Sequence, residues 1–172
     1  GTFEDPVTLE TPSGVRSVAV GDWNRDGLLD LATTNHPSHL VSVLLCNAAG
    51  NFTLLKDLAV GSEHHNHDIT SLDFNGDGFL DLMLALDFTG LIPLQGKGDG
   101  QFARKPAVVN LELFPMFVGG FRLDGDGLDD VIVQSREGSD LVSCVGLSDG
   151  TGEFQRVQEL GKSFFCFPAV VD

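Results

Sequence analysis

The chain has 172 residues, of which 42% are hydrophobic, so it is long enough to bury a sizeable core and too apolar for a disordered chain. Its 25 acidic residues outnumber its 10 basic residues and give a formal net charge of −15, which excludes the basic surface of a nucleic-acid-binding protein. No apolar stretch approaches the ~18 residues of a membrane-spanning helix, so we expect neither a nucleic-acid partner nor a membrane span.

Short apolar segments separated by turn-forming residues follow one another along the chain, and none shows the 3.6-residue period of a helix. Four such segments recur in every repeat of about 50 residues, which is typical of the four-stranded blade of a β-propeller. We therefore predict an all-β fold of β-propeller blades, each with four antiparallel strands, in a single repeat region over residues 1–172. The predicted blades span 11–60, 61–110 and 111–160, with flanking strands at 3–10 and 163–171. The strands expected within the blades are 16–21, 30–34, 40–46, 52–60, 68–72, 80–86, 91–95, 102–110, 116–121, 130–134, 141–145 and 154–160.

Two sequence markers share this period. The first is a Gly-x-Phe triplet, which ends at Phe3, Phe52, Phe102 and Phe154. The second is an acidic nonapeptide, which we name loop one (22–30), loop two (73–81) and loop three (122–130). Each loop follows a predicted strand of small residues, which suits the innermost strand of a blade. We therefore expect each loop at the corner between the first and second strands of its blade.

Loops one and two have the pattern Asp-x-Asn-x-Asp-Gly-x-Leu-Asp. A hard cation such as Ca²⁺ takes six to eight oxygen ligands, and the glycine allows the sharp turn that brings the later ligands back toward the earlier ones. An EF-hand would carry a Glu at position twelve, where these loops have Thr33 and Leu84, so the closing carboxylate comes instead at position nine. The alternative is a solvated turn without metal, but the converging carboxylates would then repel one another. We predict two Ca²⁺ sites built from the side chains at positions one, three, five and nine and the backbone carbonyl at position seven: Asp22, Asn24, Asp26, Asp30 and Leu28, then Asp73, Asn75, Asp77, Asp81 and Phe79.

Loop three departs from this pattern, because Arg122 stands where the first Asp is expected. Two interpretations are open. The guanidinium could take the place of the cation and pair directly with the carboxylates that remain, Asp124, Asp126 and Asp130 with Asp129 beside them. Alternatively, Arg122 points away and a weaker third Ca²⁺ site survives, formed by Asp124, Asp126, Leu128 and Asp130.

Loops of this form, set between strands and alternating with Gly-x-Phe, resemble FG-GAP/VCBS repeats over nearly the whole chain. Such repeats build the propeller of integrin α subunits and of many secreted proteins, and in that family the loops bind Ca²⁺ on one face. The resemblance implies Ca²⁺ as the cofactor, an extracellular or periplasmic location, and a non-catalytic module for adhesion or for binding a protein or glycan. The alternative within the family is a lectin, or a scaffold domain of a secreted carbohydrate-active enzyme of the polysaccharide-lyase type. Against a sugar site, the single Trp lies within loop one and there is no Tyr.

Three blades do not close a ring, because closed propellers usually have at least four. We expect either further blades of a larger propeller or an oligomer partner that completes the ring. A protein or glycan ligand is expected on the face opposite the calcium loops, where the connection entering the second blade carries His64, His65 and His67. For these histidines a polar surface loop, a ligand contact and a Zn²⁺ or Cu²⁺ site remain open.

The three cysteines, Cys46, Cys144 and Cys166, all lie in apolar, strand-like segments. This placement predicts buried small side chains rather than a disulfide framework or a catalytic thiol. No nucleophile elbow, P-loop, zinc-protease or nucleotide-binding motif is present, so we do not expect an enzyme.

Overall fold

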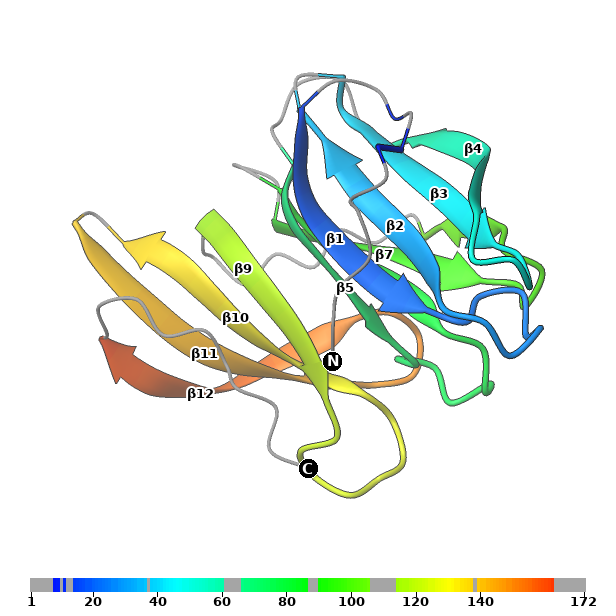
Figure 1. Cartoon of the computed structure of the whole chain (residues 1–172). Coiled ribbons are helices and arrows are strands. Elements are labelled where there is room, and N and C mark those ends of the chain that lie inside the picture. Colours follow the sequence, from blue (N-terminus) through cyan, green and yellow to red (C-terminus); the bar gives the residue numbers. More distant parts are fainter. Residues whose placement is uncertain are drawn as a thin grey trace, which may run out of the picture.

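A computed structural model describes residues 8, 9, 11, 14–36, 38–60, 66–86, 90–105, 114–137 and 139–162. Within these residues all regular structure is β-strand, and the strands form three four-stranded antiparallel sheets in chain order (Figure 1). We name them sheet one (β1–β4), sheet two (β5–β8) and sheet three (β9–β12). The strands are β1 Val15–Gly21, β2 Asp30–Asn35, β3 Leu40–Cys46, β4 Phe52–Ala59, β5 Asn66–Leu72, β6 Asp81–Leu86, β7 Gly90–Gly96, β8 Phe102–Arg104, β9 Phe114–Phe121, β10 Asp130–Glu137, β11 Asp140–Ser148 and β12 Phe154–Lys162.

The predicted all-β class and the four antiparallel strands of each repeat are confirmed. Many strand ends differ from the prediction by one to three residues, as at β10 (Asp130–Glu137) and β11 (Asp140–Ser148). The largest difference is at β8, which is only Phe102–Arg104, and residues 106–110 of the strand predicted there lie outside the described residues. The predicted flanking strands at 3–10 and 163–171 lie outside the described residues, apart from Thr8 and Leu9, which belong to no strand. No helix capable of crossing a bilayer occurs in the described part of the chain.

The first strands of the three sheets, β1, β5 and β9, lie next to one another (Figure 1). The Asp68 carboxylate of β5 joins all three, because it accepts hydrogen bonds from the Ser17 hydroxyl of β1 and from the Val118 amide of β9. Close approach also depends on glycine. A Cβ added to Gly120 of β9 would lie 2.7 Å from the Cβ of Leu72 in β5. The small residues predicted for these strands are thus needed where neighbouring sheets come together.

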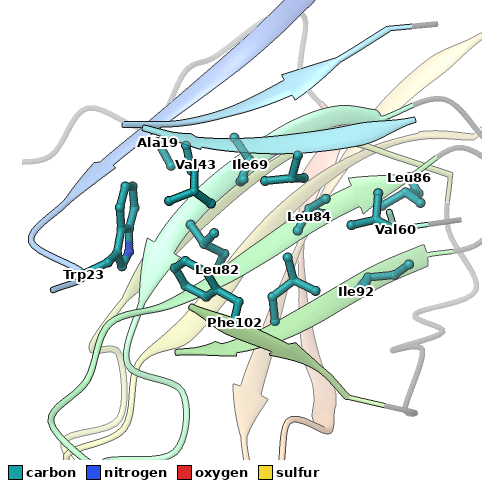
Figure 2. Close-up of a cluster of buried hydrophobic side chains, with 13 residues drawn as sticks. Ala19, Trp23, Val43, Val60, Ile69, Leu82, Leu84, Leu86, Ile92 and Phe102 are labelled. Atoms are coloured by element: carbon teal, nitrogen blue, oxygen red, sulfur yellow. The ribbon is translucent and has the colours of Figure 1, made fainter. Parts of the chain in front are cut away.

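Sheet two is packed between the other two, and each of its faces contributes to a separate hydrophobic core. The residues of β6 are all buried, and so are nearly all of those of β7. One core is shared with sheet one (Figure 2) and the other with sheet three. The first core includes residues of sheet one (Ala32, Val41 and Val43) and of sheet two (Leu82, Leu84 and Ile92). The second core includes residues of sheet two (Met83 and Leu91) and of sheet three (Val131, Val133 and Cys144).

The cysteines follow this packing only in part. Cys144 is buried in the core between sheets two and three, as predicted, and burial raises the pKa of its thiol. Cys46 is only half-buried, so the prediction of burial is wrong there, because this residue ends β3 beside a solvent-exposed turn. Both are free thiols, and Cys166 lies outside the described residues.

Candidate metal centre

The three acidic loops occupy equivalent places in the fold. Loop one joins β1 to β2, loop two joins β5 to β6, and loop three joins β9 to β10. Since the first strands lie side by side, the three corners are neighbours. A Cβ added to Gly76 in loop two would lie 2.9 Å from the side chain of Leu128 in loop three. The Arg25 guanidinium of loop one stands 5.2 Å from the centroid of the Phe79 ring in loop two.

The loops share one backbone conformation. Positions four and six have positive φ in each, a region that suits glycine because it has no Cβ. Arg25 takes this conformation at position four of loop one, where the other two loops have glycine. The angles are 59° and 85° at Arg25 and Gly27, 69° and 78° at Gly76 and Gly78, and 83° and 95° at Gly125 and Gly127.

The carboxylate at position one organises its own loop. The Asp22 oxygens accept hydrogen bonds from the amides of Asp26 (3.1 Å) and Gly27 (2.9 Å). The Asp73 oxygens accept from the amides of Gly76 (2.8 Å) and Gly78 (3.0 Å). Two anionic residues are therefore held at the start of loops one and two by the backbone that follows them.

Positions three, five and seven form a repeated ladder. The side-chain oxygen at position three accepts from the amide at position five, and the carboxylate at position five accepts from the amide at position seven. All six hydrogen bonds measure 2.8–3.1 Å. They join Asn24, Asp26 and Leu28 in loop one, Asn75, Asp77 and Phe79 in loop two, and Asp124, Asp126 and Leu128 in loop three.

The closing aspartate at position nine is fully buried in every loop and ties the loop to the third strand of its sheet. One carboxylate oxygen accepts a hydrogen bond from the backbone amide at position two of the loop. The other oxygen accepts one from the backbone amide of the last residue of that strand. The pairs are Trp23 and Cys46 for Asp30 (3.1 and 2.8 Å), Phe74 and Gly96 for Asp81 (3.3 and 2.7 Å), and Leu123 and Ser148 for Asp130 (2.9 and 3.0 Å). Sequence reasoning assigned this position only to metal binding and missed its structural role.

Within loop one and within loop two, burial and the neighbouring carboxylates raise the pKa of the closing aspartate. Burial raises the pKa of Asp81 to about 7, and the charges of Asp77 and Asp73 raise it further against the opposing hydrogen bond from Gly96. Burial likewise raises the pKa of Asp30, to which the charges of Asp26 and Asp22 add. A carboxylate disfavoured by its neighbours in this way is one that a bound cation would stabilise.

The donor chemistry of loops one and two fits Ca²⁺, with three carboxylates and one amide oxygen in each. The side chains do not, however, form a ready-made cage. Among the described residues no three His, Cys, Asp or Glu side chains are grouped so that they could hold a metal ion. Two exposed carboxylates instead accept hydrogen bonds from side-chain amides. Asp26 accepts from Asn24 at 2.9 Å, and Asp77 accepts from Gln95 at 3.2 Å. The ligand roles of these residues stay predictions.

In loop three the guanidinium of Arg122 pairs with Asp129, with Nε 3.1 Å from Oδ1. This partner lies at position eight, outside the predicted ligand set of Asp124, Asp126 and Asp130. The second oxygen of Asp129 accepts a hydrogen bond from the amide of Asp73 in loop two, at 2.6 Å. Loop three is thus fastened to loop two.

The two sequence markers contact each other across neighbouring sheets, which the sequence analysis did not foresee. Trp23 at position two of loop one packs edge-on against Phe102, the Gly-x-Phe residue of sheet two, with ring centroids 5.9 Å apart. Phe74 of loop two packs in the same way against Phe154 of sheet three, at 6.4 Å. The signal was present in the sequence as an aromatic residue at position two of both loops.

Of the three histidines considered as ligand contacts, only His67 is described. It lies in β5 rather than in the connection before it, so the prediction of a loop position is wrong for this residue. It stands near the start of the strand, at the end remote from loop two. His64 and His65 lie outside the described residues.

No protein-family model matches the chain, and no curated protein matches it significantly.

Proposed function

We propose that the chain is a calcium-binding, non-catalytic β-propeller module of the FG-GAP/VCBS type, which works outside the cell or in the periplasm in adhesion or in binding a protein or glycan. Its calcium ions are held by loops one and two through the side chains at positions one, three, five and nine and the carbonyl at position seven. When bound, Ca²⁺ would neutralise the carboxylates of the loop and brace the corner between two strands.

One observation carries the calcium proposal. The same acidic loop recurs at the same corner of consecutive sheets, with the same backbone conformation and the same ladder of hydrogen bonds. In loops one and two the pKa of the closing Asp30 or Asp81 is raised, chiefly by burial and to a smaller extent by the other carboxylates of the same loop.

The propeller architecture is supported by the way in which the sheets adjoin. Each has its strands in simple sequence order, and the first strands of neighbouring sheets lie together. Each loop therefore projects from the same side of the assembly. The partner would bind the opposite side, and further blades or an oligomer partner would complete the ring.

The carbohydrate-active alternative receives less support. Sugar sites commonly use exposed aromatic platforms, but Trp23 is 1% exposed and lies against Phe102. The only Trp of the chain is therefore a packing residue and is not free to stack on a sugar.

A calorimetric titration tests the proposal. Ca²⁺ is expected to bind at two sites, and Mg²⁺ more weakly, because Mg²⁺ gives up its water ligands reluctantly. Asp26→Asn and Asp77→Asn should each remove one site. These substitutions keep an oxygen that can accept the amide of Leu28 or Phe79 and remove only the charge.

Asp99→Asn, in the exposed turn between β7 and β8, serves as the control for a general loss of negative charge. It should leave both sites intact. The absence of any Ca²⁺ binding, or equal losses in all three variants, would refute the proposal.

A further inference from the structure

Loop three differs from both other loops at positions one, two, three and eight, and the differences at positions one and eight bring in residues that contact each other. Position one is Arg122, where loops one and two have aspartate. Position eight is Asp129, where they have Leu29 and Leu80. Taken separately, each change resembles the loss of a metal-binding sequence pattern.

The two residues, Arg122 and Asp129, form an ion pair with each other. Arg122 Nε lies 3.1 Å from Asp129 Oδ1, and the Arg122 side chain is 67% exposed whereas that of Asp129 is only 18% exposed. Asp129 also makes two hydrogen bonds with the backbone of Asp73. Its Oδ2 accepts from the Asp73 amide at 2.6 Å, and its own amide donates to the Asp73 carbonyl at 3.0 Å.

The residue at position eight of loop two likewise contacts the corner before it, that of loop one. Leu80 of loop two packs beside Gly21, the residue just before loop one, where an added Cβ would lie 2.9 Å from its Cδ1. An apolar contact therefore joins loops one and two, whereas an ionic contact joins loops two and three. No acidic loop precedes loop one among the described residues, and its position-eight residue, Leu29, is 63% exposed.

We propose that loop three holds no calcium ion, and that the Arg122–Asp129 pair instead fixes the backbone of Asp73 and so positions the first calcium ligand of loop two. This inference rests on the proposed calcium sites in loops one and two. A guanidinium has no acceptor to offer a cation, and its positive charge disfavours a cation bound beside it. Asp129, in turn, serves loop two rather than its own loop.

The number of calcium sites tests the first half of the proposal. Calorimetry should count two in the natural chain. The double variant Arg122→Asp with Asp129→Leu gives loop three the residues that loop two has at positions one and eight, and it keeps an oxygen ligand, Asp124, at position three. It should bind three calcium ions, with the site in loop two weakened. Three sites in the natural chain, or two in a folded double variant, would overturn the assignment. Failure of the underlying calcium proposal is distinguishable, because the natural chain would then bind none.

The affinity of loop two tests the second half. In an Asp26→Asn background, which leaves loop two as the site measured, Asp129→Asn should weaken Ca²⁺ binding by roughly tenfold, the usual size of an effect from a residue that orients a ligand. Arg122→Lys should retain part of the affinity that Arg122→Gln loses. A role confined to folding would lower the melting temperature without this graded loss of affinity.

The matched control is Glu159→Gln, which removes a carboxylate from a second ion pair, Arg156–Glu159 on β12. It should leave the affinity of loop two unchanged. An Asp129→Asn variant that binds Ca²⁺ as tightly as its parent would refute the positioning role.

Discussion

At the scale of single residues, Trp23 shows how a side chain within a polar loop can belong to the core. It is 1% exposed, packs edge-on against Phe102, and its indole nitrogen has no hydrogen-bond partner among the described residues. The acidic residues around it are exposed or half-buried, apart from the closing Asp30. Position two of the loop therefore anchors it to the neighbouring sheet, whereas Asn24 at position three is half-buried and Asp26 at position five is exposed.

Trp23→Ala should lower the free energy of unfolding by about 3–5 kcal/mol, because it removes a large buried aromatic side chain and leaves a cavity. Trp23→Phe should cost less than about 1.5 kcal/mol. Loop two carries Phe74 at the same position, and the change also removes a buried N–H without a partner. Urea denaturation measures both values, and equal costs for the two substitutions would contradict the packing role.

Asp81 gives a prediction about pH. Its pKa in the metal-free folded chain is raised to about 7, chiefly by burial and also by Asp77 and Asp73, whereas an unfolded aspartate titrates near 3.8. Between these values the folded state binds more protons than the unfolded state, so this group stabilises the fold at low pH and loses that contribution as the pH rises toward 7. The stability of the metal-free chain relative to its Asp81→Asn variant should therefore fall from about pH 4 to about pH 7 and change little above that.

Urea denaturation in a chelator at several pH values measures this difference. The comparison with Asp81→Asn removes the contribution of the many other carboxylates. A difference that grows with pH would contradict the assignment of a raised pKa. Since Ca²⁺ requires the ionised carboxylate, the affinity of loop two should also weaken as the pH falls below about 7.

At the scale of the elements, the closing aspartate holds each sheet corner together. Asp130 joins the amide of Leu123 in loop three to that of Ser148 at the end of β11. The same arrangement recurs at Asp30 and Asp81, with both oxygens used each time. The corner is therefore braced by hydrogen bonds before any cation is considered.

Asp130→Ala should lower the free energy of unfolding by roughly 2–4 kcal/mol, because it leaves two backbone amides without their acceptor. Asp124→Ala, at an exposed position of the same loop, should cost below about 1 kcal/mol. Thermal unfolding in a chelator compares them. If both variants melt at the same temperature, the bracing role of Asp130 is wrong.

The strands themselves could be predicted from sequence, because turn residues separate short apolar segments at a regular interval. What could not be predicted are the contacts between elements far apart in the chain. Nothing local marks Asp129 as a partner of Asp73, and the shortness of β8 has no clear sequence signal. The role of Asp130 was hidden because a buried acceptor of backbone amides and a metal ligand require the same residue type.

At the scale of the whole molecule, the two sequence markers act as the two halves of one contact. The aromatic residue of each of the first two loops meets the Gly-x-Phe residue of the next sheet, and the Ser148 hydroxyl adds a hydrogen bond of 2.7 Å to the Phe74 carbonyl. The period of the sequence is therefore the period of sheet-to-sheet packing. Leu123, at the same position of loop three, is 43% exposed and marks where this packing stops within the described residues.

The central claim is that a cation binds in the acidic loops, and Trp23 offers a direct reporter of it. Tb³⁺ substitutes for Ca²⁺ at oxygen sites and emits when a nearby excited indole transfers energy to it. This chain has one Trp, next to Asp22, and no Tyr. Excitation of Trp23 should therefore give Tb³⁺ emission that Ca²⁺ displaces, that Asp26→Asn abolishes and that Asp77→Asn leaves in place. The absence of emission, or emission that survives Asp26→Asn unchanged, would contradict the proposed calcium site.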